Sequence, residues 1–128
     1  MVGCAQPHHA QALTPMAAPQ TLGSLELLVL LAVLRLGDGA YAVAVRDAIA
    51  ERTQSDPSRG AVSVTLDRLD RKGLLRSRLG EPTAERGGKA KRLYTLAAPG
   101  HRALRATLQG TQAMLQGLPP EMVQPVPP

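Results

Sequence analysis

The sequence predicts a mainly helical fold that carries one small β-hairpin. Apolar residues recur at helical spacing in three successive segments, 25–36, 40–52 and 58–72. Two short strand patterns follow at 75–80 and 91–96, with a Gly-Gly pair between them, and a last helical pattern occupies 98–117. Because helices joined by short turns and followed by a hairpin form a winged helix-turn-helix, we expect that fold with one additional C-terminal helix.

The aromatic content and the net charge of the sequence limit the kinds of molecule that the protein is expected to bind. The 128 residues suffice for one domain, and with 44% hydrophobic but 2% aromatic residues its core must be built from Leu, Val and Ala. Tyr41 and Tyr94 stand without any Phe or Trp, which argues against single-stranded nucleic acid stacked on several exposed rings. The net charge of +5 and the pI near 10.1 indicate a polyanionic partner.

The two ends of the chain are expected to lie outside the domain. Residues 1–21 lack helical periodicity and the features of a secretory signal, so we interpret them as a disordered leader. Residues 119–128 are half proline and are interpreted as a disordered tail. The longest apolar run, 25–36, is too short for the roughly 20 residues that cross a bilayer. Cys4 is the single cysteine, so no intrachain disulfide can form, and we expect a cytoplasmic protein.

The first two helical segments are expected to form the core. Residues 25–36 are apolar almost all round, as in a central buried helix, and Gly37 begins the Gly-Asp-Gly run that ends it. In 40–52, the expected buried residues are Ala42, Val45, Ala48 and Ile49. Tyr41 lies in the first turn, where its ring either packs alone or also brings its hydroxyl to a phosphate.

The segment beginning at Ser58 carries the most functional information. Ser58 is a good N-cap because its hydroxyl can accept a hydrogen bond from a free backbone N–H. Val62, Leu66 and Leu69 share one face, and Gly73 closes the helix. The remaining face is basic with small polar residues near the start. Such a helix suits a major groove, although taken alone the pattern favours a surface helix with a solvated charged face.

The predicted hairpin strengthens the nucleic-acid interpretation. Arg86, Lys89, Lys91 and Arg92 lie within seven residues around the Gly-Gly turn, and four cations there suit phosphates or a minor groove. On the returning strand, alternation directs Tyr94 and Leu96 toward the core.

The last helix carries a short heptad pattern. Apolar residues and one threonine repeat at 4-3-4-3 spacing: Leu104, Leu108, Thr111, Leu115 and Leu118. This seam either packs on its own domain or meets the same seam of a second copy. We favour a homodimer, with 98–118 as the dimerisation helix and 22–97 as the DNA-binding domain.

Residues 22–104 resemble the PadR family of bacterial transcriptional regulators. The resemblance rests on LGSLELLVLLAVLRLGDGAYAVAVRDAI, on GAVSVTLDRLDRKGLL and on LGEPTAERGGKAKRLYTLAAPGHRAL. It implies a winged helix-turn-helix homodimer that binds a palindromic operator, usually as a repressor, and that dimerises through its C-terminal helix. The chain departs from the family pattern with Ser63 where tyrosine is often found, with Ala97 where threonine usually opens the last helix, and with no tryptophan to sandwich a flat effector.

The leading hypothesis is therefore a transcriptional regulator that binds specific double-stranded DNA. The candidates for base edges are Arg59, Ser63, Val64 and Arg68. The candidates for phosphates are Tyr41, Ser58, Gly60, Lys72, Arg86, Lys89, Lys91 and Arg92. The alternative is a winged-helix adaptor that binds protein rather than DNA.

We expect no enzyme, cofactor or metal site. His101 has no second His, Cys or carboxylate cluster at suitable spacing. His8 and His9 are adjacent in the predicted leader without another ligand nearby. A small-molecule effector and the operator sequence remain open.

Overall fold

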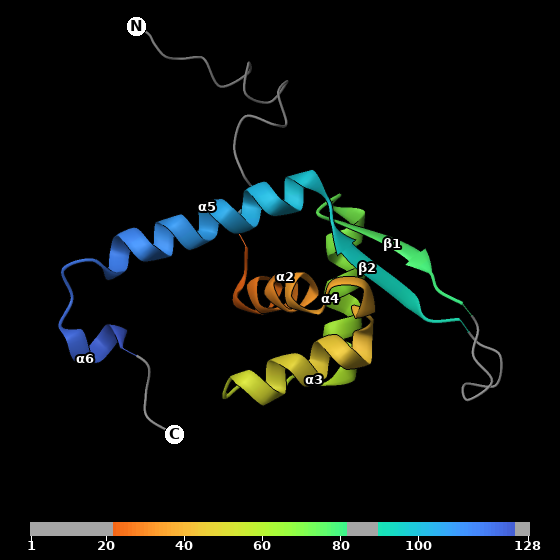
Figure 1. Cartoon of the computed structure of the whole chain (residues 1–128), viewed down its shortest axis with the longest axis horizontal. Helices are drawn as coiled ribbons and strands as arrows, with labels where there is room; N and C mark the ends of the chain where they lie inside the picture. Colours follow the sequence, from red (N-terminus) through yellow and green to blue (C-terminus); the bar gives the residue numbers. More distant parts are fainter. Residues whose placement is uncertain (1–21, 82–89, 125–128) are drawn as a thin grey trace, which may run out of the picture.

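The computed structural model describes residues 22–81 and 90–124 (Figure 1). The predicted leader, the hairpin turn with Arg86 and Lys89, and the last four residues lie outside this range. The elements are α2 (Ser24–Leu36), the 3-10 turn η1 (Gly37–Gly39), α3 (Ala42–Arg52), α4 (Arg59–Arg71), β1 (Leu75–Leu79), β2 (Arg92–Leu96), α5 (Ala98–Leu115) and α6 (Pro120–Val123). The mainly helical fold with one antiparallel strand pair is confirmed.

Helix α2 lies at the centre of the helical core, as its apolar sequence predicts. It packs against α3, α4 and α5, and Val29, Leu30 and Val33 are buried. Gly37 ends it with φ +63°, a conformation that glycine adopts without the steric cost of a Cβ. The helix thus anchors the elements on which the rest of the fold is built.

Helix α3 begins at Ala42, two residues later than predicted. Tyr41 is still extended, with φ −125° and ψ 168°, and is the N-cap rather than a residue of the first turn. Val45 and Ile49 are buried and Ala42 and Ala48 are half-buried, so the predicted inner face is confirmed.

Helix α4 has the start, inner face and end that the sequence predicts. Ser58 Oγ accepts the backbone N–H of Ala61 at 3.0 Å. The three predicted inner residues are fully buried: Val62, Leu66 and Leu69. Gly73, with φ +81°, then turns the chain into β1. Burial of the leucines fixes which side of α4 faces outward.

Strands β1 and β2 pair antiparallel, with Leu75 opposite Leu96. Tyr94 is buried and Leu96 packs against the core, as alternation predicts. The Tyr94 backbone N–H donates to the carbonyl oxygen of Ala40 at 2.9 Å. This bond ties β2 to the residues just before α3, so the strand pair is joined to the helical core near Tyr94.

Helix α5 packs on the core only through its first turns. Ala103 and Leu104 are buried, whereas Leu108 and Leu115 are exposed. The first residue of the predicted seam, Leu104, therefore belongs to the core of its own domain, which the heptad spacing alone did not indicate. Figure 1 shows α5 continuing past α2 toward α6.

Helix α6 differs from the prediction, because it lies within 119–128, which the sequence predicts to be a disordered tail. Pro120 is its first residue, and proline is tolerated there because the first N–H groups of a helix have no partner within it. The proline content that suggested disorder is thus compatible with one helical turn.

Glu26 and Lys72 form an ion pair between α2 and the end of α4. Their Oε2 and Nζ atoms are 3.0 Å apart, and Glu26 Oε1 also accepts the backbone N–H of Gly23 at 3.0 Å. The Gly23 hydrogen bond, then Lys72, hold the Glu26 pKa below its ordinary value of 4.5 although burial opposes them. A carboxylate with a lowered pKa stabilises the fold above its unfolded pKa and loses that contribution as the pH falls through the folded pKa.

Glu26→Gln is therefore expected to lower the free energy of unfolding by about 1 kcal/mol at neutral pH. The difference from wild type should shrink as the pH falls below 4.5. Urea unfolding at a series of pH values measures it, with the exposed Glu51→Gln as the control of equal charge change. A difference that stays constant across this range would contradict the role of the Glu26 carboxylate.

Candidate nucleic-acid interface

The outward face of α4 is a continuous exposed surface. Its exposed residues include all four predicted base-edge candidates: Arg59, Ser63, Val64 and Arg68. Val64 is 53% exposed. The structure thus exposes all four residues, with Ser63, Val64 and Arg68 on the side of α4 away from the buried leucines and Arg59 in its first turn.

Some charged side chains on this face form ion pairs and others do not. Asp67 and Arg71 form an exposed i,i+4 ion pair at 3.1 Å. Within 22–81 and 90–124, neither Arg59 nor Arg68 forms an ion pair. Two guanidinium groups therefore remain available to an anionic or hydrogen-bonding partner.

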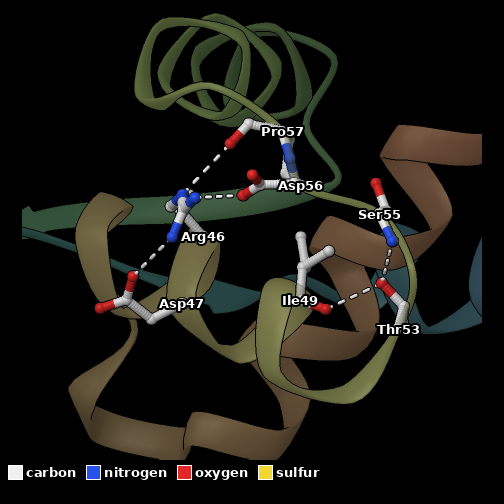
Figure 2. Close-up of polar contacts among 7 residues, drawn as sticks. All are labelled: Arg46, Asp47, Ile49, Thr53, Ser55, Asp56 and Pro57. Carbon is white, nitrogen blue, oxygen red and sulfur yellow. Dashed lines mark hydrogen bonds and ion pairs between the residues drawn. The ribbon is translucent and has the colours of Figure 1, made fainter.

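The start of α4 is fixed to α3 by Arg46, as Figure 2 shows. Arg46 Nε donates to the carbonyl oxygen of Pro57 at 3.2 Å, and its guanidinium also forms an ion pair with Asp56 and with Asp47. Because Pro57 directly precedes the N-cap Ser58, this clasp sets where the N-terminus of α4 lies. Asp56 and Pro57 lie 10 and 11 positions from Arg46, which is not a helical spacing, so the sequence did not indicate these contacts.

Thr53 orders the same link from its other end. Its Oγ1 donates to the carbonyl oxygen of Ile49 at 2.8 Å and accepts the backbone N–H of Ser55 at 3.0 Å (Figure 2). One hydroxyl thereby ends α3 and begins the turn toward α4. Arg46 and Thr53 together give the helix pair a defined connection.

Two of the phosphate candidates meet where α3 begins and β2 approaches. The Nζ of Lys91 lies 4.0 Å from the centroid of the Tyr41 ring, a cation–π contact. Both residues are half-buried. The sequence placed these residues in separate elements, and the structure joins them.

Arg92 takes part in a chain of polar contacts across the strand pair. Its guanidinium donates to Ser77 Oγ at 3.1 Å, and that hydroxyl donates to Asp70 Oδ2 at 2.8 Å. The chain links β2 through β1 to α4. Arg92 is therefore exposed but oriented by the protein itself.

Lys72 differs from the other phosphate candidates. Its side chain is 34% exposed, and its ammonium is paired with Glu26. A phosphate contact by Lys72 stays a prediction, and it would require sharing the ammonium with this carboxylate. Ser58 and Gly60, in contrast, are exposed at the start of α4, where backbone N–H groups favour an anion.

Other kinds of site find no support in the part of the chain that the structure describes. It contains no group of three His, Cys, Asp or Glu residues placed to hold a metal ion. None of its helices is long and apolar enough to cross a membrane.

A model of the transcriptional regulator PadR-like family matches residues 30–106. The chain belongs to this family. Members of the PadR-like family are transcriptional regulators that bind DNA and are not enzymes. The resemblance that the sequence suggested is therefore confirmed, and the exposed face of α4 belongs to a regulator.

Solved structures of PadR-family regulators share the fold. A PadR family regulator from hypervirulent Clostridium difficile R20291 is 21% identical, with 72% of this chain and 91% of that chain covered and a TM-score of 0.60. One from Eggerthella lenta DSM 2243 is 21% identical, with 86% and 93% covered and a TM-score of 0.53.

Bordetella bronchiseptica BpsR, whose DNA binding is regulated by 6-hydroxynicotinic acid, is 24% identical, with 88% and 80% covered and a TM-score of 0.55. No match was found among curated proteins. At these identities the solved structures establish the winged-helix fold of the chain.

Proposed function

We propose that this PadR-family regulator binds a palindromic DNA operator as a cytoplasmic homodimer and represses transcription by inserting α4 into the major groove. One observation carries the proposal. The inner residues of α4 are fully buried, Ser63, Val64 and Arg68 are exposed on the side away from them, and Arg59 is exposed in the first turn. Side chains on such a face reach base edges when the helix lies in the groove.

The surroundings of α4 supply contacts of a different kind. Ser58 and Gly60 at its N-terminus, Tyr41 with Lys91, and Arg92 on β2 suit phosphates, which fix position without reading sequence. Arg86 and Lys89, in the segment between the strands, are proposed for the same role from the sequence. Lys72 completes this set only if it shares its ammonium with Glu26.

The homodimer is supported by the apolar side chains that α5 leaves exposed. Leu108 and Leu115 follow the seam of the predicted dimerisation helix, together with Thr111, and are exposed in the single chain. The helix ends at Leu115 and Gly117 turns the chain with φ +85°, so Leu118, predicted as the last residue of the seam, lies beyond it. Burial against a second copy would remove this apolar surface from water. A two-fold dimer would present its two α4 helices about 34 Å apart, to successive major grooves.

Arg68→Ala and Lys89→Ala are expected to affect DNA binding differently. Loss of a base contact by Arg68 should cost about 1–3 kcal/mol and relax discrimination at one base pair of each half-site. Loss of a phosphate contact by Lys89 should weaken all duplexes alike and reduce the salt slope by about 1. Band-shift titrations on single-base operator variants at several salt concentrations measure both effects. Equal losses on every sequence for both variants would refute the assignment.

A winged-helix adaptor that binds protein is the second candidate, because the Asp67–Arg71 pair partly balances the charge of the α4 face. Titration against the upstream region of its own gene at about 0.15 M salt distinguishes the two candidates. A specific shift supports the regulator bound to DNA, and an absence of specific binding favours the adaptor.

A further inference from the structure

An open groove lies between helices α2 and α3, and side chains of both helices line it. Its volume is about 560 Å³, and its lining is mostly apolar, with Leu28, Leu31 and Leu34 from α2 and Ile49 from α3. Two exposed arginines, Arg35 and Arg52, also line it. Among the residues placed by the structure, neither guanidinium forms an ion pair. The groove thus combines an apolar floor with two unsatisfied positive charges.

The segment 118–123, which we call the C-terminal hook, is also apolar but carries a negative charge. Leu118, Met122 and Val123 are 46%, 68% and 44% exposed. Glu121 is the one acidic residue of the sequence after Glu85, and it makes no ion pair within the described range. Exposed large apolar side chains around one carboxylate are suited to a surface that offers apolar contact and positive charge.

We propose that the C-terminal hook of one copy docks into the α2–α3 groove of a second copy. Its apolar side chains would pack on the α2 leucines, and the Glu121 carboxylate would pair with Arg35 and Arg52. This inference rests on the proposed homodimer and adds a second contact to it, because the seam of α5 does not include the groove. Two-fold symmetry would make the docking reciprocal, with two hooks in two grooves.

The occupant is a second copy for reasons of placement and continuity. Figure 1 shows α6 apart from α2 and α3, beyond the far end of α5. The exposed leucines of α5 lead along the chain directly to the hook. A helix of 18 residues spans about 27 Å, so the dimer seam would carry each hook away from its own groove and toward its partner.

A charge exchange tests the proposed pairing. Glu121→Arg is expected to raise the dimer dissociation constant by about tenfold, because it places a third cation beside two arginines. Adding Arg35→Glu and Arg52→Glu to this variant should restore most of the affinity, whereas those two changes alone should weaken the dimer. Gln109→Arg, at an exposed position of α5 outside the hook, is the control for an added positive charge. Sedimentation over a concentration series measures each variant.

The outcomes separate this inference from the proposed homodimer. If the wild type sediments as a monomer at all concentrations, the homodimer and the docking both fail. If the wild type dimerises but Glu121→Arg dimerises equally well, only the docking is overturned. The same result is expected if a small apolar molecule, and not the hook, occupies the groove. Rescue by the exchanged charges supports the docking.

Cysteine cross-linking identifies whose hook occupies the groove. In a Cys4→Ser background, a Val123→Cys chain is mixed with a Leu34→Cys chain and oxidised mildly. A disulfide between the two different chains supports the proposal. A chain carrying both cysteines that forms a disulfide only within itself, or no disulfide in either experiment, would overturn it.

Discussion

Gly100→Ala is expected to lower the free energy of unfolding by at least about 2 kcal/mol, although alanine is the better helix former. A Cβ at this position would lie 2.1 Å from the carbonyl oxygen of Leu74. That oxygen already accepts the backbone N–H of Ala97 at 3.0 Å. The backbone cannot yield without moving α5 away from the strand pair, so the added methyl group strains the junction between them.

The same substitution elsewhere in α5 is the matched control. Gly110 is exposed, and a Cβ there would meet nothing within 4 Å. Gly110→Ala should therefore stabilise the protein by about 1 kcal/mol through helix propensity. Urea or thermal unfolding measures both variants. If Gly100→Ala stabilised the chain as Gly110→Ala does, the close packing of α5 on Leu74 would be wrong.

Val64→Glu is expected to abolish specific DNA binding, with a loss of at least about 100-fold, while the fold is retained. Val64 is more than half exposed on the outward face of α4, so the substitution removes little buried apolar surface. A carboxylate at that position would face the bases and phosphates of the bound duplex, and like charges brought together cost several kcal/mol. Band-shift titration measures the loss.

The control for this prediction carries the same new charge on another helix. Gln109→Glu adds a carboxylate to an exposed position of α5, which changes the net charge equally but lies outside the proposed interface. It should bind DNA within a few-fold of wild type, as long-range repulsion is screened at physiological salt. Equal loss in both variants would mean that net charge, and not the α4 face, governs binding.

Local physics explains why α4 was predictable from its sequence. Its N-cap hydroxyl, its i, i+4, i+7 apolar stripe and its terminal glycine act within a few residues of one another. The exposed face followed directly, because burial of Val62, Leu66 and Leu69 leaves only one side for solvent. The alternation of β2 similarly placed Tyr94 in the core.

Contacts between distant residues were not predictable in the same way. The contacts of Arg46 with Asp56 and Pro57 form only after the chain turns beyond α3, so no local pattern indicates them. Glu26 interrupted an apolar run in the sequence, yet it pairs with Lys72, 46 residues away.

The heptad pattern of α5 did not reveal where the domain core ends. Leu104 has the heptad spacing of a dimer seam but belongs to the core of its own domain, and only the packing distinguishes these two roles. The short helix α6 was missed because proline content suggests disorder while proline at a helix start is permitted.

The most direct test of the central claim is methylation interference on the operator. Guanine N7 lies in the major groove, where α4 is proposed to read the bases. Methylation at guanines in two symmetric half-sites, centred about 10 base pairs apart, should block the wild type, and Arg68→Ala should lose sensitivity at one of these positions. Binding that is indifferent to major-groove methylation, or that shows the same pattern in Arg68→Ala, would contradict the account.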